Sequence, residues 1–174
     1  MALHGVFFLH CKQIIAYINK EKEDNINYLD FKKLSERDTK LIYEYIFEYL
    51  RLPELNSQLI YFFIFDYYLC VNFAIENIQR FLSARGYDVE FNNVMTDKTI
   101  VALNKEIDKY TRAKKVINLF NELILFRQKV YLVLLKHTNT KVIKTKQMAR
   151  LNLFTLCTID LQKLDYFDPE KLYF

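Results

Sequence analysis

The chain has 174 residues, a net charge of +4 and a composition that is 52% hydrophobic, with 13 Tyr and 15 Phe. This length fits one domain with ample material for a core, and the presence of only two Gly and two Pro disfavours a turn-rich β-sandwich or barrel. Three distant cysteines without a C-x-x-C motif are typical of thiols in a reducing compartment, and we expect neither a metal site nor a cofactor.

A helical period of apolar residues begins near the N-terminus. The first predicted helix spans about His4 to Lys20, and a charged loop follows it. Ser35 begins the second helix, with Asp38 as its capping-box partner, and Pro53 stops it.

The middle of the chain predicts a central helix and then two helices joined by a polar loop. Residues 56–70 are apolar almost all round, which is typical of a buried helix, and residues 72–82 either continue it or start a new one. Gly86 supplies a left-handed position after that run, and Thr96 and Asp97 cap the next helix.

Further helices are predicted at residues 96–110, 112–137 and 147–164. Strand-like alternation is confined to a short piece, Tyr87, Val89 and Phe91. The class is therefore all-α, a single bundle of six or seven helices over residues 1–174.

No segment of the sequence predicts a membrane anchor or a signal peptide. The apolar run Val6–Leu9 is too short for a signal and lacks a basic region before it. Residues 59–71 contain Asp66 and fall short of the roughly 20 residues that a spanning helix needs. We expect cytoplasmic synthesis and no membrane span.

Positive charge gathers in one place, Lys136 to Arg150, where five basic residues have no acid among them. Elsewhere Lys and Arg alternate with acids, so no nucleic-acid partner is predicted. The cluster is either a solvated loop and helix start or a patch that attracts an anionic polymer such as cell wall.

The strongest functional signal lies in the helix–loop–helix of residues 78–104. Ile78 and Gln79 stand at the "L-Q" of its first helix, Ala74 one turn earlier extends this match to "A-x-x-x-L-Q", and Gly86 follows the last apolar turn. The next helix matches "T-x-x-A-L" through Thr99, Ala102 and Leu103. This segment resembles one found in bacterial and phage cell-wall lytic proteins.

Other pieces extend the resemblance in the same order along the chain. They are Asp30 to Tyr43, Pro53, Leu59, Phe65-Asp66, Leu123, Arg127, Tyr131 and Arg150. Together they resemble glycoside hydrolase family 108, the phage- and secretion-associated N-acetylmuramidases. The resemblance implies a lysozyme-like core over residues 28–165, a degenerate N-terminal segment 1–27 and a tail 166–174.

The departures from that family fall on its chemistry. There a Glu in an early "H-E-G-G" motif protonates the glycosidic oxygen, and here Leu9-His10-Cys11 would be its counterpart. Cys11 then stands where the acid should be, and residues 1–15 contain no Asp or Glu. A thiol is a far weaker acid than a carboxyl group. The resemblance therefore implies a frame that has lost catalysis.

Five residues remain as candidates for a site, each with an alternative. Asp66, Gln79 and Arg150 are the candidate glycan contacts. Asp66 is otherwise a hydrogen-bonded or ion-paired buried carboxylate, and Gln79 an inter-helix hydrogen bond. Glu21 and Glu23 are the catalytic candidates if an acid survives, and otherwise belong to a solvated charged loop.

Three functions follow. The first is a catalytically degenerate muramidase-like domain that serves as a structural or binding component of a phage particle or an envelope-crossing secretion machine. It would have protein partners, and peptidoglycan as a further one. The second is an active peptidoglycan hydrolase, and the third is an unrelated helical adaptor that holds partners through exposed Tyr and Phe.

Overall fold

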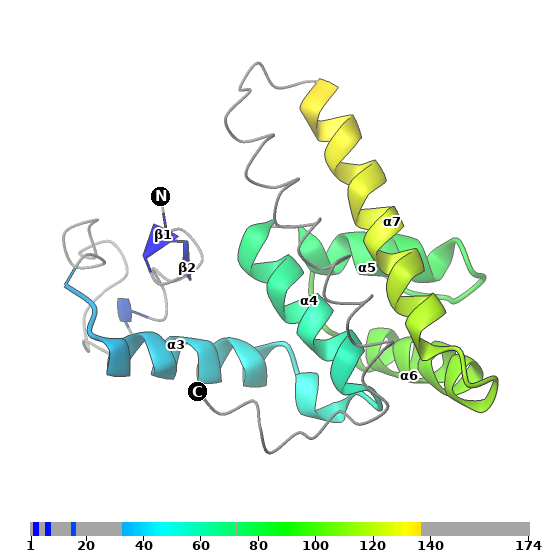
Figure 1. The fold of residues 1–174 in the computed structure, drawn as a ribbon, viewed down its shortest axis with the longest axis horizontal. Coiled ribbons are helices and arrows are strands. Elements are labelled where there is room, and N and C mark those ends of the chain that lie inside the picture. Colours follow the sequence, from blue (N-terminus) through cyan, green and yellow to red (C-terminus); the bar gives the residue numbers. More distant parts are fainter. Residues whose placement is uncertain (1, 4–5, 8–14, 17–32, 72, 137–174) are drawn as a thin grey trace. The chain divides into compact units, whose positions relative to one another are not determined.

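The computed structural model describes residues 2–3, 6–7, 15–16, 33–71 and 73–136 (Figure 1). These residues are largely helical, which confirms the all-α class. They contain five α-helices rather than the six or seven expected, and the helix predicted at 147–164 lies outside them. The chain divides into two compact units, Met1–Lys109 and Tyr110–Phe174.

The prediction of a helix from His4 to Lys20 is wrong at its start. Strand β1 (Ala2–Leu3) pairs antiparallel with strand β2 (Val6–Phe7), with Ala2 opposite Phe7. Val and Phe both favour extended backbone, and here hydrogen bonds between the two strands satisfy its polar groups. Residues 15–16 are helical and buried.

Helix α3 (Glu36–Tyr49) begins at the predicted capping box. The Asp38 backbone N–H donates to Ser35 Oγ over 3.1 Å, and the Ser35 backbone N–H donates to Asp38 Oδ2 over 2.9 Å. The helix ends before Pro53, which lies in the short 3-10 helix η2 (Leu52–Glu54). Both the predicted start and the predicted stop are confirmed.

Helix α4 (Gln58–Cys70) is the buried apolar helix that the sequence predicts. Ser57 caps it by accepting from the Ile60 N–H. The Phe47 ring of α3 meets the Tyr61 ring of α4 edge-on, with centroids 5.3 Å apart. The side chains of α4 with no exposed surface are Ile60, Phe63, Ile64 and Tyr67.

Helix α5 (Ala74–Ser83) is a new helix, because Val71 ends α4 in an extended conformation. It packs on α4, where the Asn77 amide donates to the Tyr67 hydroxyl over 3.0 Å. Helix α6 (Asp97–Arg112) follows a loop, and its Thr99, Ala102 and Leu103 are buried as predicted.

The described part of the second unit consists of the end of α6 and helix α7 (Val116–Lys136). Lys114 joins them at a φ of 55°. Residues 114 and 115 donate backbone hydrogen bonds to the carbonyls of Thr111 and Tyr110, which closes α6. The Tyr110 hydroxyl then donates to Glu122 over 2.8 Å.

Three α7 residues that carry the resemblance, Leu123, Arg127 and Tyr131, are each 1% exposed. The Arg127 Nε and Nη2 atoms lie 3.4 and 3.3 Å from the Tyr131 hydroxyl one turn later. These three side chains therefore form the inner side of α7. Within the described residues, no helix has the length and apolarity to cross a membrane.

Candidate binding site

The loop between α5 and α6 is fixed at its start by Gly86. This residue has a φ of 86°, and its N–H donates to the Ser83 carbonyl over 2.9 Å. The Tyr87 N–H donates to the Leu82 carbonyl over 3.2 Å, so the pair forms a Schellman motif with Gly86 at C′. A Cβ at this position would meet nothing within 4 Å, so only the backbone conformation requires glycine.

Gln79 holds the middle of this loop from α5. Its side chain is fully buried, and Nε2 donates to Asn92 Oδ1 over 2.9 Å and to the Val94 carbonyl over 2.8 Å. Its Oε1 accepts from the backbone N–H groups of Asn92 and Asn93, over 3.1 and 3.2 Å. The amide thus bonds the loop backbone in the way that a neighbouring strand would.

Asn93, in the loop, caps the start of α5. Its Oδ1 accepts from the backbone N–H groups of Ile75 and Glu76, each over 3.1 Å. Phe73, at the N-cap position of α5, makes no capping hydrogen bond. The loop therefore supplies the acceptor that a Ser or Asp normally supplies at a helix start. Asn93 has a φ of 57°, which Asn tolerates better than most residues.

The end of the loop joins the same hydrogen-bond network. The Thr99 N–H donates to Thr96 Oγ1 over 3.3 Å, which confirms Thr96 as the cap of α6. The two hydroxyls lie 3.0 Å apart, and Thr99 Oγ1 lies 3.3 Å from Gln79 Nε2. The loop is therefore tied to both of its helices.

This fixed loop carries apolar side chains on its outer surface. Phe91 is 47% exposed and Val94 is 48% exposed. The Arg80 guanidinium lies over the Phe91 ring, 4.8 Å from its centroid, and is held there by Glu76 at 2.6 Å. An aromatic ring on a fixed backbone binds a partner with little loss of conformational entropy. We define Phe91, Val94 and Arg80 as the loop surface.

A buried carboxylate, Glu106, lies where α6 faces the start of the loop. It is 2% exposed, and its Oε1 accepts from Arg85 Nε over 3.0 Å. Its Oε2 accepts from the Tyr87 hydroxyl over 2.7 Å. Burial, and then the hydrogen bond to Glu106, raise the pKa of the Tyr87 phenol to about 12. Both carboxylate oxygens are thus engaged in holding the segment 85–87.

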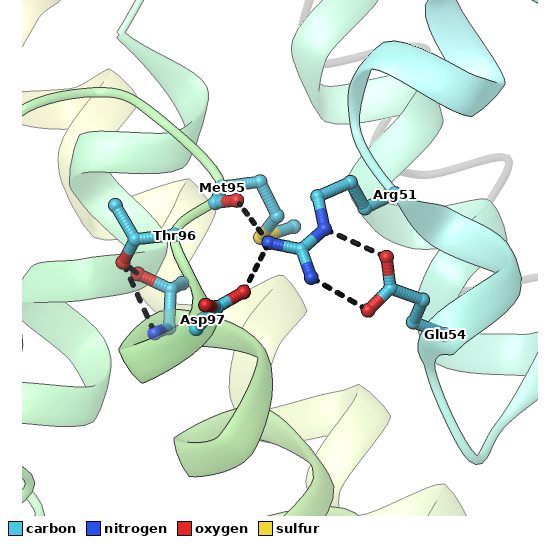
Figure 2. Close-up of polar contacts among 6 residues, drawn as sticks. Arg51, Glu54, Met95, Thr96 and Asp97 are labelled. Carbon is cyan, nitrogen blue, oxygen red and sulfur yellow. Dashed lines mark hydrogen bonds and ion pairs between the residues drawn. The ribbon is translucent and has the colours of Figure 1, made fainter.

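A second cluster joins the end of α3 to the start of α6 (Figure 2). Arg51 has a φ of 51° and donates from Nε and Nη2 to the two Glu54 oxygens, each over 2.7 Å. Its Nη1 donates to Asp97 Oδ1 over 2.6 Å and lies 3.5 Å from the Met95 carbonyl. The Arg51 hydrogen bonds lower the pKa of the Glu54 carboxyl. The Arg51 charge is therefore paired within the protein by Glu54 and Asp97, which indicates a structural role.

Of the five residues predicted for a site, two lie in the described part of the chain. Asp66 is buried in α4 and Gln79 is buried in α5, where it bonds the loop. Glu21, Glu23 and Arg150 lie outside the described residues. The described residues therefore include only part of the predicted set, and the glycan-binding roles stay predictions.

Sequence reasoning missed several residues of the loop network. They are Arg85, Tyr87, Asn92, Asn93 and Glu106. The one available signal was the Asn92-Asn93 pair, since Asn is typical of turns and of left-handed backbone. No group of three or more His, Cys, Asp or Glu in the described ranges is arranged to hold a metal ion.

No protein-family model, curated protein or solved structure matches this chain.

Proposed function

We propose that the protein is a catalytically degenerate, muramidase-like binding domain that works inside a larger assembly such as a phage particle or an envelope-crossing secretion machine. In this proposal the loop surface is the contact, and the cell-wall glycan is its ligand. The protein is made in the cytoplasm and reaches its site as part of that assembly.

One observation supports binding over catalysis most directly. The polar side chains of the segment that carries the resemblance are hydrogen-bonded to one another, while Phe91 and Val94 face solvent. Gln79 bonds the loop through both of its amide atoms, and Glu106 bonds Arg85 and Tyr87. Glycoside cleavage needs two carboxyl groups facing the sugar, one of them as an acid.

The test is sedimentation of the purified protein with insoluble peptidoglycan. We expect the parent protein to cosediment and Phe91→Ala to bind at least about five-fold more weakly, because the substitution removes the aromatic ring from the loop surface. Phe62→Ala is the matched control, since Phe62 is a comparably exposed phenylalanine, 41%, on α4. It should bind like the parent.

Zymography on the same cell wall separates binding from hydrolysis. We expect no clearing by the parent protein. Clearing that Glu21→Gln or Glu23→Gln abolishes would establish the active hydrolase instead. Failure of the parent to sediment with peptidoglycan would remove glycan as the ligand and favour the helical adaptor.

The adaptor is the second candidate because a specific surface favours it. Leu41, Tyr45 and Tyr49 are exposed along α3, outside the segment that carries the loop surface. Exposed aromatic residues on a helix are typical of protein contacts.

A further inference from the structure

Helix α3 carries a stripe of exposed apolar side chains. Leu41, Tyr45 and Tyr49 are 42%, 45% and 51% exposed. They are four residues apart, so they form one line along the helix surface. The Tyr45 and Tyr49 rings are stacked, with centroids 6.3 Å apart and planes 10° apart. We name Leu41, Tyr45 and Tyr49 the α3 stripe.

Exposed charges beside the α3 stripe are arranged by sign along the helix. On one side of the stripe Arg37 and Lys40 precede Glu44 and Glu48, and Lys40 pairs with Glu44 over 3.9 Å within the helix. Asp38, in the first turn, lies on the other side of the stripe. Arg37 and Glu48 are three turns apart, which places them on the same side of the helix but about 16 Å from each other. They are too far apart to pair within one helix.

An antiparallel second copy of α3 brings these opposite charges together. A two-fold axis that crosses the stripe between Leu41 and Tyr45 places Leu41 of one copy against Tyr45 of the other. The same axis places Arg37 near Glu48 of the second copy, on the same side of the helix pair. The stripe and its charges are therefore self-complementary.

We propose that the α3 stripe is an interface between two copies of this chain, packed antiparallel through α3. This interface goes beyond the proposed function and uses a different surface. Three half-exposed side chains from each copy form a contact much smaller than the roughly 1,600 Å² of a standard interface. The dimer is therefore weak and depends on concentration.

The test is sedimentation-equilibrium ultracentrifugation of the full chain over a range of concentrations. We expect a monomer–dimer equilibrium. Arg37→Glu and Glu48→Arg should each weaken the dimer about ten-fold, because each places like charges opposite one another. The double variant should restore the dissociation constant to within about three-fold of the parent, because it only exchanges the positions of the charges.

Restoration by the double variant is specific to an antiparallel pair, because the two residues do not meet in one helix. All three variants change exposed residues, and circular dichroism should show parental helix content. Lys105→Glu, on the exposed side of α6, is the charge-matched control and should leave association unchanged.

Three results would overturn the proposal: a parent that is monomeric at every concentration, single variants that associate like the parent, or a double variant as weak as the singles. The first result would mean that another part of the chain or a different protein covers the stripe. Phe91→Ala, which tests the loop surface, should dimerise normally, so the two proposals fail separately.

Discussion

A single amide side chain, that of Gln79, orders much of the α5–α6 loop. Gln79 satisfies two backbone N–H groups and one backbone carbonyl of the loop. A loop with its backbone groups satisfied from inside the protein has few alternative conformations. At the residue scale, the ordered backbone of the loop therefore fixes Phe91 in its exposed position.

Replacement of Gln79 by Ala should lower the free energy of unfolding by about 2–4 kcal/mol, because it empties a fully buried position and leaves part-buried loop groups without partners. Urea denaturation measures the change. Amide exchange at Asn92 and Asn93 should also become faster, since their N–H groups lose Gln79 Oε1. Gln58→Ala, in the first turn of α4, is the control and should change stability by less than about 0.5 kcal/mol. If Gln79→Ala had the same free energy of unfolding as the parent, the hydrogen bonds of Gln79 would contribute nothing to stability.

Tyr87 should make stability fall at high pH. Its folded-state pKa is raised to about 12 from the ordinary value of about 10, so folding favours the neutral phenol. The stabilisation is complete below pH 10 and is lost as the pH rises from about 10 through 12. The loss should reach up to about 2 kcal/mol in urea unfolding measured across this range.

Tyr87→Phe is the control for that titration, since it removes the phenol and keeps the ring. Its unfolding free energy should fall less steeply between pH 10 and 12 than that of the parent. Identical slopes would show that Tyr87 is not the group responsible.

At the element scale, helix ends that adopt left-handed backbone recur in this fold. Gly86 ends α5 and Lys114 ends α6, and both accept the geometry of a Schellman motif. Gly adopts a positive φ at no steric cost, whereas Lys does not. The end of α5 can therefore be predicted from the sequence, whereas the end of α6 cannot.

Lys114→Gly should stabilise the protein by about 0.5–1 kcal/mol, because it relieves left-handed strain at an exposed position. Thermal unfolding measures the gain. Lys115→Gly, next in the chain and outside the positive-φ residues, should be neutral or destabilising. A loss of stability in Lys114→Gly would show that the lysine side chain contributes more than the strain costs.

Most described elements could be predicted from periodicity and capping residues. The starts of α3 and α6 follow from Ser35 and Thr96, because a hydroxyl before an apolar run satisfies orphan amides. The antiparallel pairing of β1 and β2 could not be predicted, because residues 6–7 fit a helical stripe equally well. Asn93 as the cap of α5 was hidden as well, since it follows its helix in the chain.

At the scale of the whole molecule, one helix connects the two compact units. Their boundary, between Lys109 and Tyr110, falls inside α6. A continuous helix cannot lose its structure on one side of such a boundary without freeing backbone groups on the other. The expectation of a single domain can be tested on this basis.

We expect one cooperative unfolding transition, with coincident urea curves from circular dichroism and from amide exchange in α4 and α7. Lys109→Pro should break α6 at the boundary, cost about 3 kcal/mol or more and separate the curves. Lys109→Ala is the control for the lost side chain. Two transitions in the parent would show that the units unfold independently.

The position of Phe91 beneath Arg80 has a practical consequence in a chain with 13 Tyr and no Trp. Phe91→Trp would introduce a single indole, and its fluorescence would report from one known place. Because a guanidinium lies against that ring, any ligand that displaces Arg80 should shift the emission. Residue 91 is thus a suitable position for a fluorescent probe in the binding experiments proposed above.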